Sequence, residues 1–121
     1  MKILIIDDEP DTVTYLSTWL EDNGYDTCWA SDGHSGMQAI IAERPDLVLL
    51  DINMPGQTGL QLYRDLNQNE DYRGISVIFI TGLADYQMFD RECEALPQPA
   101  ACIEKPFNLE ALRAAIEKIH S

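Results

Sequence analysis

Short runs of aliphatic residues recur along the chain, and each stops at or near a polar side chain able to do chemistry. The runs and the polar residues that follow them are Lys2–Ile6 before Asp7 and Asp8, Leu47–Leu50 before Asp51, Val77–Ile80 before Thr81, and Ala101–Ile103 before Lys105. Runs of this length with aliphatic residues at nearly every position are typical of strands buried on both faces. We therefore predict a strand for each run, and a fifth, less apolar strand over 27–30.

Segments with the apolar spacing of amphipathic helices separate these strands. The predicted helices, with their inward-facing residues, are 10–23 (Val13, Leu16, Leu20), 35–43 (Met37, Ile40, Ile41), 58–68 (Leu60, Tyr63, Leu66), 84–96 (Phe89, Cys93, Leu96) and 109–119 (Leu109, Leu112, Ile116, Ile119). Gly24 suits the position just after a helix, and Asn108 suits an N-cap. Strand and helix thus alternate five times.

A strictly alternating order predicts an α/β fold with a parallel sheet covered by helices on both faces. The chain of 121 residues is long enough for one such domain, over 1–121, and we expect no effector domain. Ligands of open parallel sheets bind beyond the carboxyl ends of the strands. The polar residues that follow the strands are therefore expected to face one crevice.

Charge and composition exclude several classes of function. The 21 acidic residues outnumber the 8 basic ones and give a net charge of -13, which disfavours direct binding to nucleic acid and leaves too few bases for a membrane-binding patch. No apolar stretch has the length of a signal peptide core or of a membrane span. Three cysteines without metal-ligand spacing, Cys28, Cys93 and Cys102, indicate free thiols and a cytoplasmic protein.

The residues expected in the crevice suit phosphoryl transfer. Asp7, Asp8 and Asp51 would repel one another unless a cation or a proton offset their charge, and Mg²⁺ is the natural cofactor for oxygen ligands of this kind. A hydroxyl at Thr81 and an ammonium at Lys105 could bind phosphoryl oxygens. A carboxylate can also act as the nucleophile and form an aspartyl phosphate.

The sequence resembles the receiver domain of two-component response regulators over its whole length. The matching residues are Asp7-Asp8-Glu9, Asp51 followed by Met54-Pro55-Gly56, Thr81-Gly82 and Lys105-Pro106-Phe107. The resemblance implies a flavodoxin-like, three-layer α/β/α sandwich whose five-stranded parallel sheet has the order 2-1-3-4-5.

The resemblance also implies a role for each site residue. Asp51 would accept the phosphoryl group. Asp8, Asp51 and the backbone carbonyl of Asn53 would bind Mg²⁺ directly, and Asp7 through water. The phosphoryl oxygens would be held by Thr81, Lys105 and the backbone N–H groups of Ile52 and Gly82.

Two features depart from the family pattern. Cys102 stands where receivers usually carry an aromatic residue three positions before the lysine, and the segment 96–101 contains two prolines and no glycine. We expect either a remodelled signalling face or a tolerated loop variation. Glu9 could reach metal-bound water, although solvation is the default for such a side chain, and His34 and His120 are expected at the surface.

The sequence therefore predicts a phosphorylatable signalling switch and not an enzyme acting on an external metabolite. The expected partners are a sensor histidine kinase or phosphotransfer protein, and an unknown downstream protein or effector domain. Two alternatives stay open at this point. One is a degenerate receiver that acts as a constitutive interaction module, and the other is a flavodoxin-like cofactor binder or metal-dependent phosphohydrolase.

Overall fold

A computed structural model describes residues 1–52, 59–81, 99–104 and 108–120 of the chain. Five parallel strands form one sheet in the order β2-β1-β3-β4-β5, as the resemblance implied. The strands are β1 (Lys2–Ile6), β2 (Asp26–Ala30), β3 (Leu47–Asp51), β4 (Ser76–Thr81) and β5 (Ala101–Glu104). The helices within the described residues are α1 (Pro10–Asp22), α2 (Gly33–Glu43), α3 (Gly59–Gln68) and α5 (Leu109–His120).

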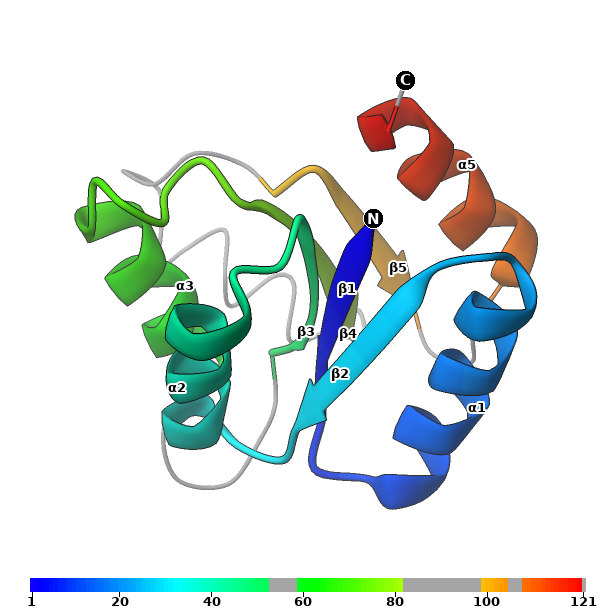
Figure 1. The fold of residues 1–121 in the computed structure, drawn as a ribbon, viewed down its shortest axis with the longest axis horizontal. Helices are drawn as coiled ribbons and strands as arrows, with labels where there is room; N and C mark the ends of the chain where they lie inside the picture. Colours follow the sequence, from blue (N-terminus) through cyan, green and yellow to red (C-terminus); the bar gives the residue numbers. More distant parts are fainter. Residues whose placement is uncertain (53–58, 82–98, 105–107, 121) are drawn as a thin grey trace.

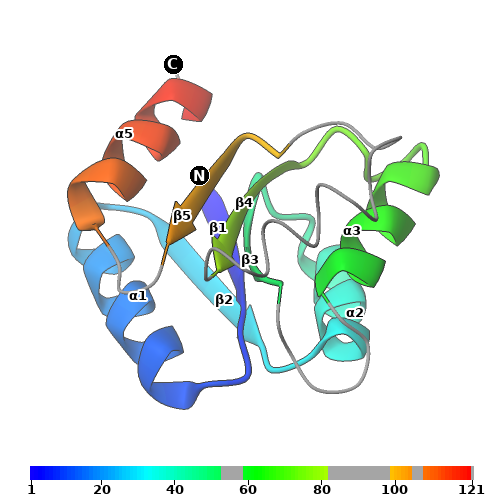
Figure 2. The same cartoon turned by 180° about the vertical axis from the view of Figure 1, so that it is seen from behind.

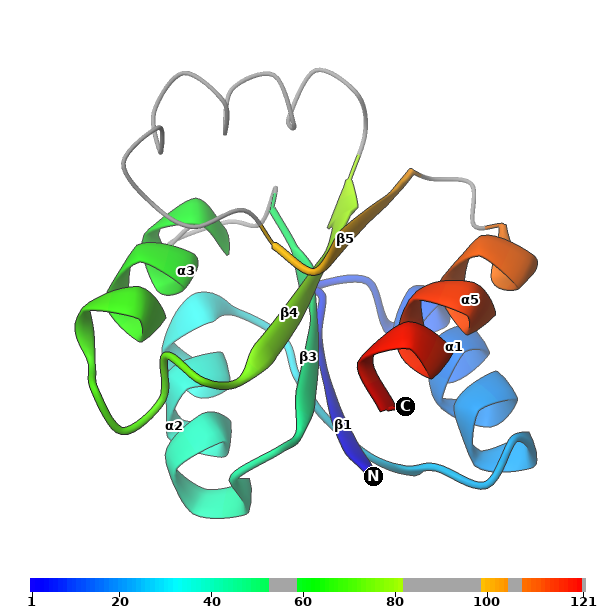
Figure 3. The same cartoon turned by 90° about the horizontal axis from the view of Figure 1, so that it is seen from above.

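The helices form two layers with the sheet between them. Helices α2 and α3 lie on one side of the sheet and α1 and α5 on the other (Figure 1), an arrangement that is also clear from behind (Figure 2) and from above (Figure 3). This is the flavodoxin-like sandwich. No helix within the described ranges is long and apolar enough to span a membrane.

Each face of the sheet has its own hydrophobic core because successive strand residues point to opposite faces. In β1, Leu4 and Ile6 pack on the α2 and α3 side, while Ile3 and Ile5 pack on the α1 and α5 side. All four of these side chains are fully buried. This double burial explains why the central strands are uninterrupted aliphatic runs instead of alternating patterns.

Four of the five helix predictions hold in position, and the inward faces of these four are as predicted with one error. The predicted inward residues of α1, α3 and α5 are buried or partly buried, and Asn108 caps α5 through a bond from the Ala111 N–H to its Oδ1 of 3.2 Å. Ile41, predicted to face inward, is 51% exposed. The buried stripe of α2 runs through Gly33, Gly36 and Ile40, which turns position 41 toward solvent. The predicted helix over 84–96 lies outside the described residues.

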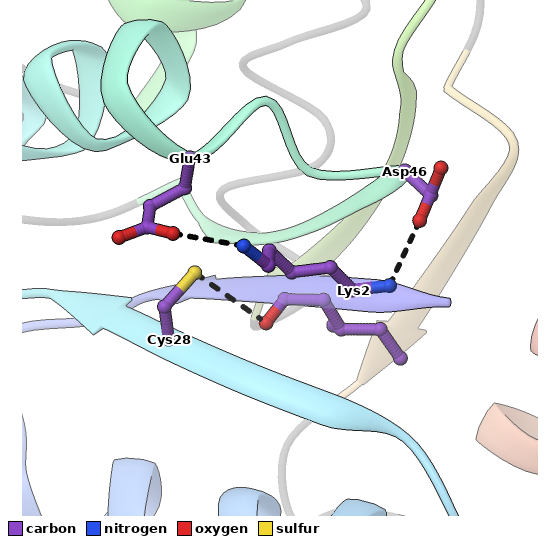
Figure 4. A network of polar contacts seen from close by, with 5 residues as sticks. Lys2, Cys28, Glu43 and Asp46 are labelled. Carbon is purple, nitrogen blue, oxygen red and sulfur yellow. Dashed lines mark hydrogen bonds and ion pairs between the residues drawn. The ribbon is translucent and has the colours of Figure 1, made fainter.

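At the end of the sheet where the strands begin, Lys2 joins three segments. Its backbone N–H donates to the Asp46 Oδ2 at 2.8 Å, and its ammonium pairs with the Glu43 Oε2 at 2.9 Å. Cys28 lies beside this pair, with its Sγ 3.9 Å from the carbonyl oxygen of Ile3 (Figure 4). The Lys2–Asp46 bond thus lies next to the start of the β1–β3 ladder, which pairs Ile3 with Leu47 and runs to Ile6 and Leu50.

Candidate functional site

The carboxyl ends of β1 and β3 bring four acidic side chains together. Asp7 follows β1, Asp51 is the last residue of β3, and the two strands are hydrogen-bonded neighbours. Asp7, Asp8, Glu9 and Asp51 each offer a carboxylate oxygen, and these four oxygens all lie within 4.8 Å of one another. The structure thus places the three predicted aspartates at one point and adds Glu9, whose predicted default was solvation.

Asp7 is held rigidly between β2 and the start of α1. Its backbone N–H donates to the carbonyl oxygen of Ala30 at 3.1 Å, and its Oδ1 accepts from the backbone N–H of Glu9 at 2.9 Å. Asp7 is 1% exposed, while Asp8 and Glu9 are exposed. The cluster therefore has a buried floor and a solvent-facing rim.

Asp51 forms the other half of the buried floor and is 3% exposed. It pairs with Ile80 of β4, and the next residue, Ile52, donates its backbone N–H to the Ile80 carbonyl oxygen at 3.4 Å. The backbone on both sides of Asp51 is therefore fixed by the central strands.

Gly59, which the sequence interpretation did not single out, packs against the backbone at the end of β3. Its backbone N–H donates to the carbonyl oxygen of Ile52 at 3.1 Å. A Cβ at this position would lie 2.7 Å from the Ile52 Cα and would collide with the Asp51 carbonyl oxygen. Only glycine lets the first residue of α3 approach the end of β3 this closely.

The structure describes some of the remaining predicted site residues and not others. Thr81 is the last residue of β4 and pairs with Glu104 at the end of β5, so its backbone lies at the same edge of the sheet as Asp51. Ile52 is buried directly after Asp51. Asn53, Gly82 and Lys105 lie outside the described residues.

The charge of the cluster fits a divalent cation. Two carboxylate charges at such separations repel by on the order of 3 kcal/mol at an effective dielectric constant of about 20, and by less where Asp8 and Glu9 meet water. A hard cation with oxygen ligands offsets this repulsion, and Mg²⁺ needs only one or two carboxylates plus waters. The donor set therefore suits Mg²⁺, with Asp7, Asp8 and Asp51 as the residues to hold it.

Cys102, the residue that departs from the family pattern, lies in β5, and β4 separates this strand from β3, which ends at Asp51. It pairs with Phe79 and packs against the core on the α2 and α3 side. Burial raises the pKa of its thiol to about 11, with a smaller contribution from the Glu104 carboxylate. Cys28 is also a free, partly buried thiol with a raised pKa, caused first by burial. Both thiols are therefore protonated at neutral pH.

Comparison with known sequences gives a consistent set of relatives. A family model described as the response regulator receiver domain matches residues 3–117. The sporulation initiation phosphotransferase F of Bacillus subtilis (strain 168) is 33% identical over 119 residues, which cover 97% of this chain and 91% of that protein. Protein PilH of Pseudomonas aeruginosa is 39% identical over 80 residues. The chain spans a smaller share of longer relatives, such as 29% of PhoP from Bacillus subtilis.

Solved structures agree with the sequence relatives. The signal receiver domain of a signal transduction histidine kinase from Syntrophus aciditrophicus is 30% identical, with a TM-score of 0.86 over 98% of this chain and 88% of that one. The response regulator protein TrrA from Thermotoga maritima, in complex with Mg²⁺ and BeF, is 28% identical, with a TM-score of 0.83 over 98% of this chain and 97% of that one. Sequence and fold thus point to the same set of proteins.

Proposed function

The chain belongs to the response regulator receiver domain family, and from this premise we propose that it is a signalling switch phosphorylated on Asp51. The observation that carries the proposal is the convergence of Asp7, Asp8 and Asp51 at the joined ends of β1 and β3. This convergence supports a nucleophilic carboxylate beside a cation site. We further propose that residues 1–121 act as one receiver domain in the cytoplasm.

Each residue has a proposed task. An Asp51 carboxylate oxygen attacks the phosphorus of a phosphohistidine, a new O–P bond forms, and the P–N bond to the imidazole breaks. Bound Mg²⁺ would supply charge neutralisation for the phosphoryl oxygens, held by Asp7, Asp8, Asp51 and the Asn53 carbonyl. Thr81, Lys105 and the N–H groups of Ile52 and Gly82 bind the product. The switch turns over no external metabolite.

The proposed phosphodonor is a sensor histidine kinase or a phosphotransfer protein. The relatives include a sporulation phosphotransferase and the receiver domain of a histidine kinase, which supports a place in a relay. The acyl phosphate would then bias a two-state equilibrium and change a protein-binding surface. With a net charge of -13, the domain is not expected to bind nucleic acid directly, so the output passes through a protein partner or a joined effector.

Acetyl phosphate provides the test. Incubated with Mg²⁺, the chain should gain a labile phosphoryl mass that EDTA prevents and that Asp51→Asn abolishes. Asp22→Asn, which removes an exposed acid at the end of α1, is the matched control and should leave the adduct intact. A chain without any adduct, even with a cognate kinase, would instead be a constitutive interaction module. Bound flavin or rapid turnover of a phosphate ester would also reject the proposal.

A further inference from the structure

Glu9 adds a fourth carboxylate to the three aspartates of the cation site. It is the N-cap residue of α1 and has an extended backbone, with φ -96° and ψ 110°. Pro10 explains this conformation, because the proline ring disfavours helical dihedrals in the preceding residue. The Glu9 side chain makes no capping hydrogen bond to the helix. Its carboxylate lies instead within 4.8 Å of the ligand oxygens of the aspartates.

The number of carboxylates matters because divalent cations differ in what they require. Mg²⁺ usually keeps several waters and takes one or two carboxylates, whereas Ca²⁺ takes six to eight oxygens in a flexible geometry. Asp7, Asp8 and Asp51 already meet the need of Mg²⁺. A fourth, longer and solvent-facing carboxylate suits the larger ion, which can recruit an additional ligand.

We propose that Glu9 is a ligand of the divalent site and shifts its cation preference toward ions larger than Mg²⁺, such as Ca²⁺. The proposal rests on the proposed function, since it concerns the same cation site. It assigns Glu9 a different role from Asp11, the next acid in the chain, which lies in the first turn of α1 and outside the cluster.

Isothermal titration of the full chain, stripped of metal and held at constant ionic strength, separates these roles. Glu9→Gln should raise the Kd for Ca²⁺ about tenfold and the Kd for Mg²⁺ about threefold or less, because only the larger ion uses the extra ligand. Asp11→Asn removes the same charge two residues away and should change both constants by less than about twofold. Far-UV circular dichroism of Glu9→Gln should match the wild type, because the side chain does not cap α1.

Two results would overturn the inference. The first is a Glu9→Gln chain that binds both ions like the wild type. The second is an equal loss for Ca²⁺ and Mg²⁺, which would make Glu9 a remote charge and not a ligand.

Asp8→Asn distinguishes a failure of this inference from a failure of the proposed function. If Asp8→Asn weakens binding of both ions and Glu9→Gln leaves their ratio unchanged, only the role of Glu9 is rejected. If the wild-type chain binds neither ion, the proposed cation site is rejected, and the role of Glu9 with it.

Discussion

Gly59 lies so close to Asp51 that a Cβ on Gly59 would collide with the Asp51 carbonyl oxygen. The obstacle is backbone held by the central strands, so it cannot turn aside as a flexible side chain can. The first residue of α3 and the last residue of β3 are therefore positioned against each other by the absence of a side chain.

Gly59→Ala should lower the free energy of unfolding by about 1–3 kcal/mol, as other overpacking substitutions do, and should also weaken Mg²⁺ binding because the Asp51 backbone must move. Urea unfolding and titration calorimetry measure the two effects. Gly36→Ala is the matched control, because its Cβ would meet the flexible Cδ1 of Ile6 at 2.8 Å and leave Asp51 in place. Equal Mg²⁺ affinities in the two variants would contradict the positioning role of Gly59.

Asp51→Asn should stabilise the metal-free chain. Asparagine has nearly the same shape and removes the repulsion between Asp51 and three neighbouring carboxylates, so we expect a gain of about 1–2 kcal/mol without divalent cations. Saturating Mg²⁺ should raise the Tm of the wild type by more than that of Asp51→Asn, which retains the other acids of the cluster but binds the ion less tightly. Asp22→Asn should show neither effect. A metal-free Asp51→Asn chain less stable than the wild type would show that the acids are not in mutual repulsion.

Cys102 should react slowly with thiol reagents. With its pKa raised to about 11, its thiolate fraction at about pH 8 is roughly a hundredfold below that of an ordinary thiol. A Cys28→Ser/Cys93→Ser chain leaves Cys102 as the sole thiol, and its labelling rate in buffer and in concentrated urea gives the comparison. Similar rates in the two conditions would contradict the burial of this thiol.

The same raised pKa predicts a loss of stability in alkali. The folded state holds the Cys102 proton more tightly than the unfolded state, so this contribution is complete below the unfolded pKa near 9 and is lost as the pH rises through about 11. Urea unfolding across this range should show a decline that is smaller in Cys102→Ala.

Phe79 and Trp29 are both aromatic strand residues, yet truncating them should change the free energy of unfolding by very different amounts. Phe79 is fully buried, with its ring centroid 4.9 Å from that of Tyr63, and Phe79→Ala should cost about 3–5 kcal/mol of unfolding free energy. Trp29 is 61% exposed on the edge strand β2, so Trp29→Ala should stay within about 0.5 kcal/mol of the wild type. Comparable losses in the two variants would contradict the burial pattern.

The sequence pattern predicted both the parallel α/β fold and the meeting of the aspartates at one sheet edge, and one physical reason explains both. Doubly buried strands need uninterrupted aliphatic runs, so the end of each run marks the sheet edge, and parallel pairing brings these ends together. Asp7 and Asp51 follow directly from that rule. The exact residue at which each strand ends was harder to predict. Asp51 and Thr81 are polar, yet they still pair within β3 and β4.

The residues that were missed depend on contacts distant in sequence or on local geometry. A lone glycine at position 59 does not reveal which backbone it touches. Glu9 was recognised from its place after the acid pair as able to reach metal-bound water, but only the fold shows that its carboxylate lies beside Asp51 of β3. Arg44 adopts a left-handed conformation, with φ 46°, at the end of α2, where sequence rules favour glycine.

The end of the sheet where Lys2 meets Asp46 has a practical consequence for labelling the protein. Met1, Asp46, Ser76 and Ile119 line one shallow cavity of about 390 Å³, so the first residue and the last turn of α5 lie where the strands begin (Figure 1). The acids lie where the strands end, roughly 16 Å away for a strand of five residues. A fluorescent reporter or a surface tether attached at Met1 or after α5 would therefore leave the cation site open to the proposed phosphodonor protein.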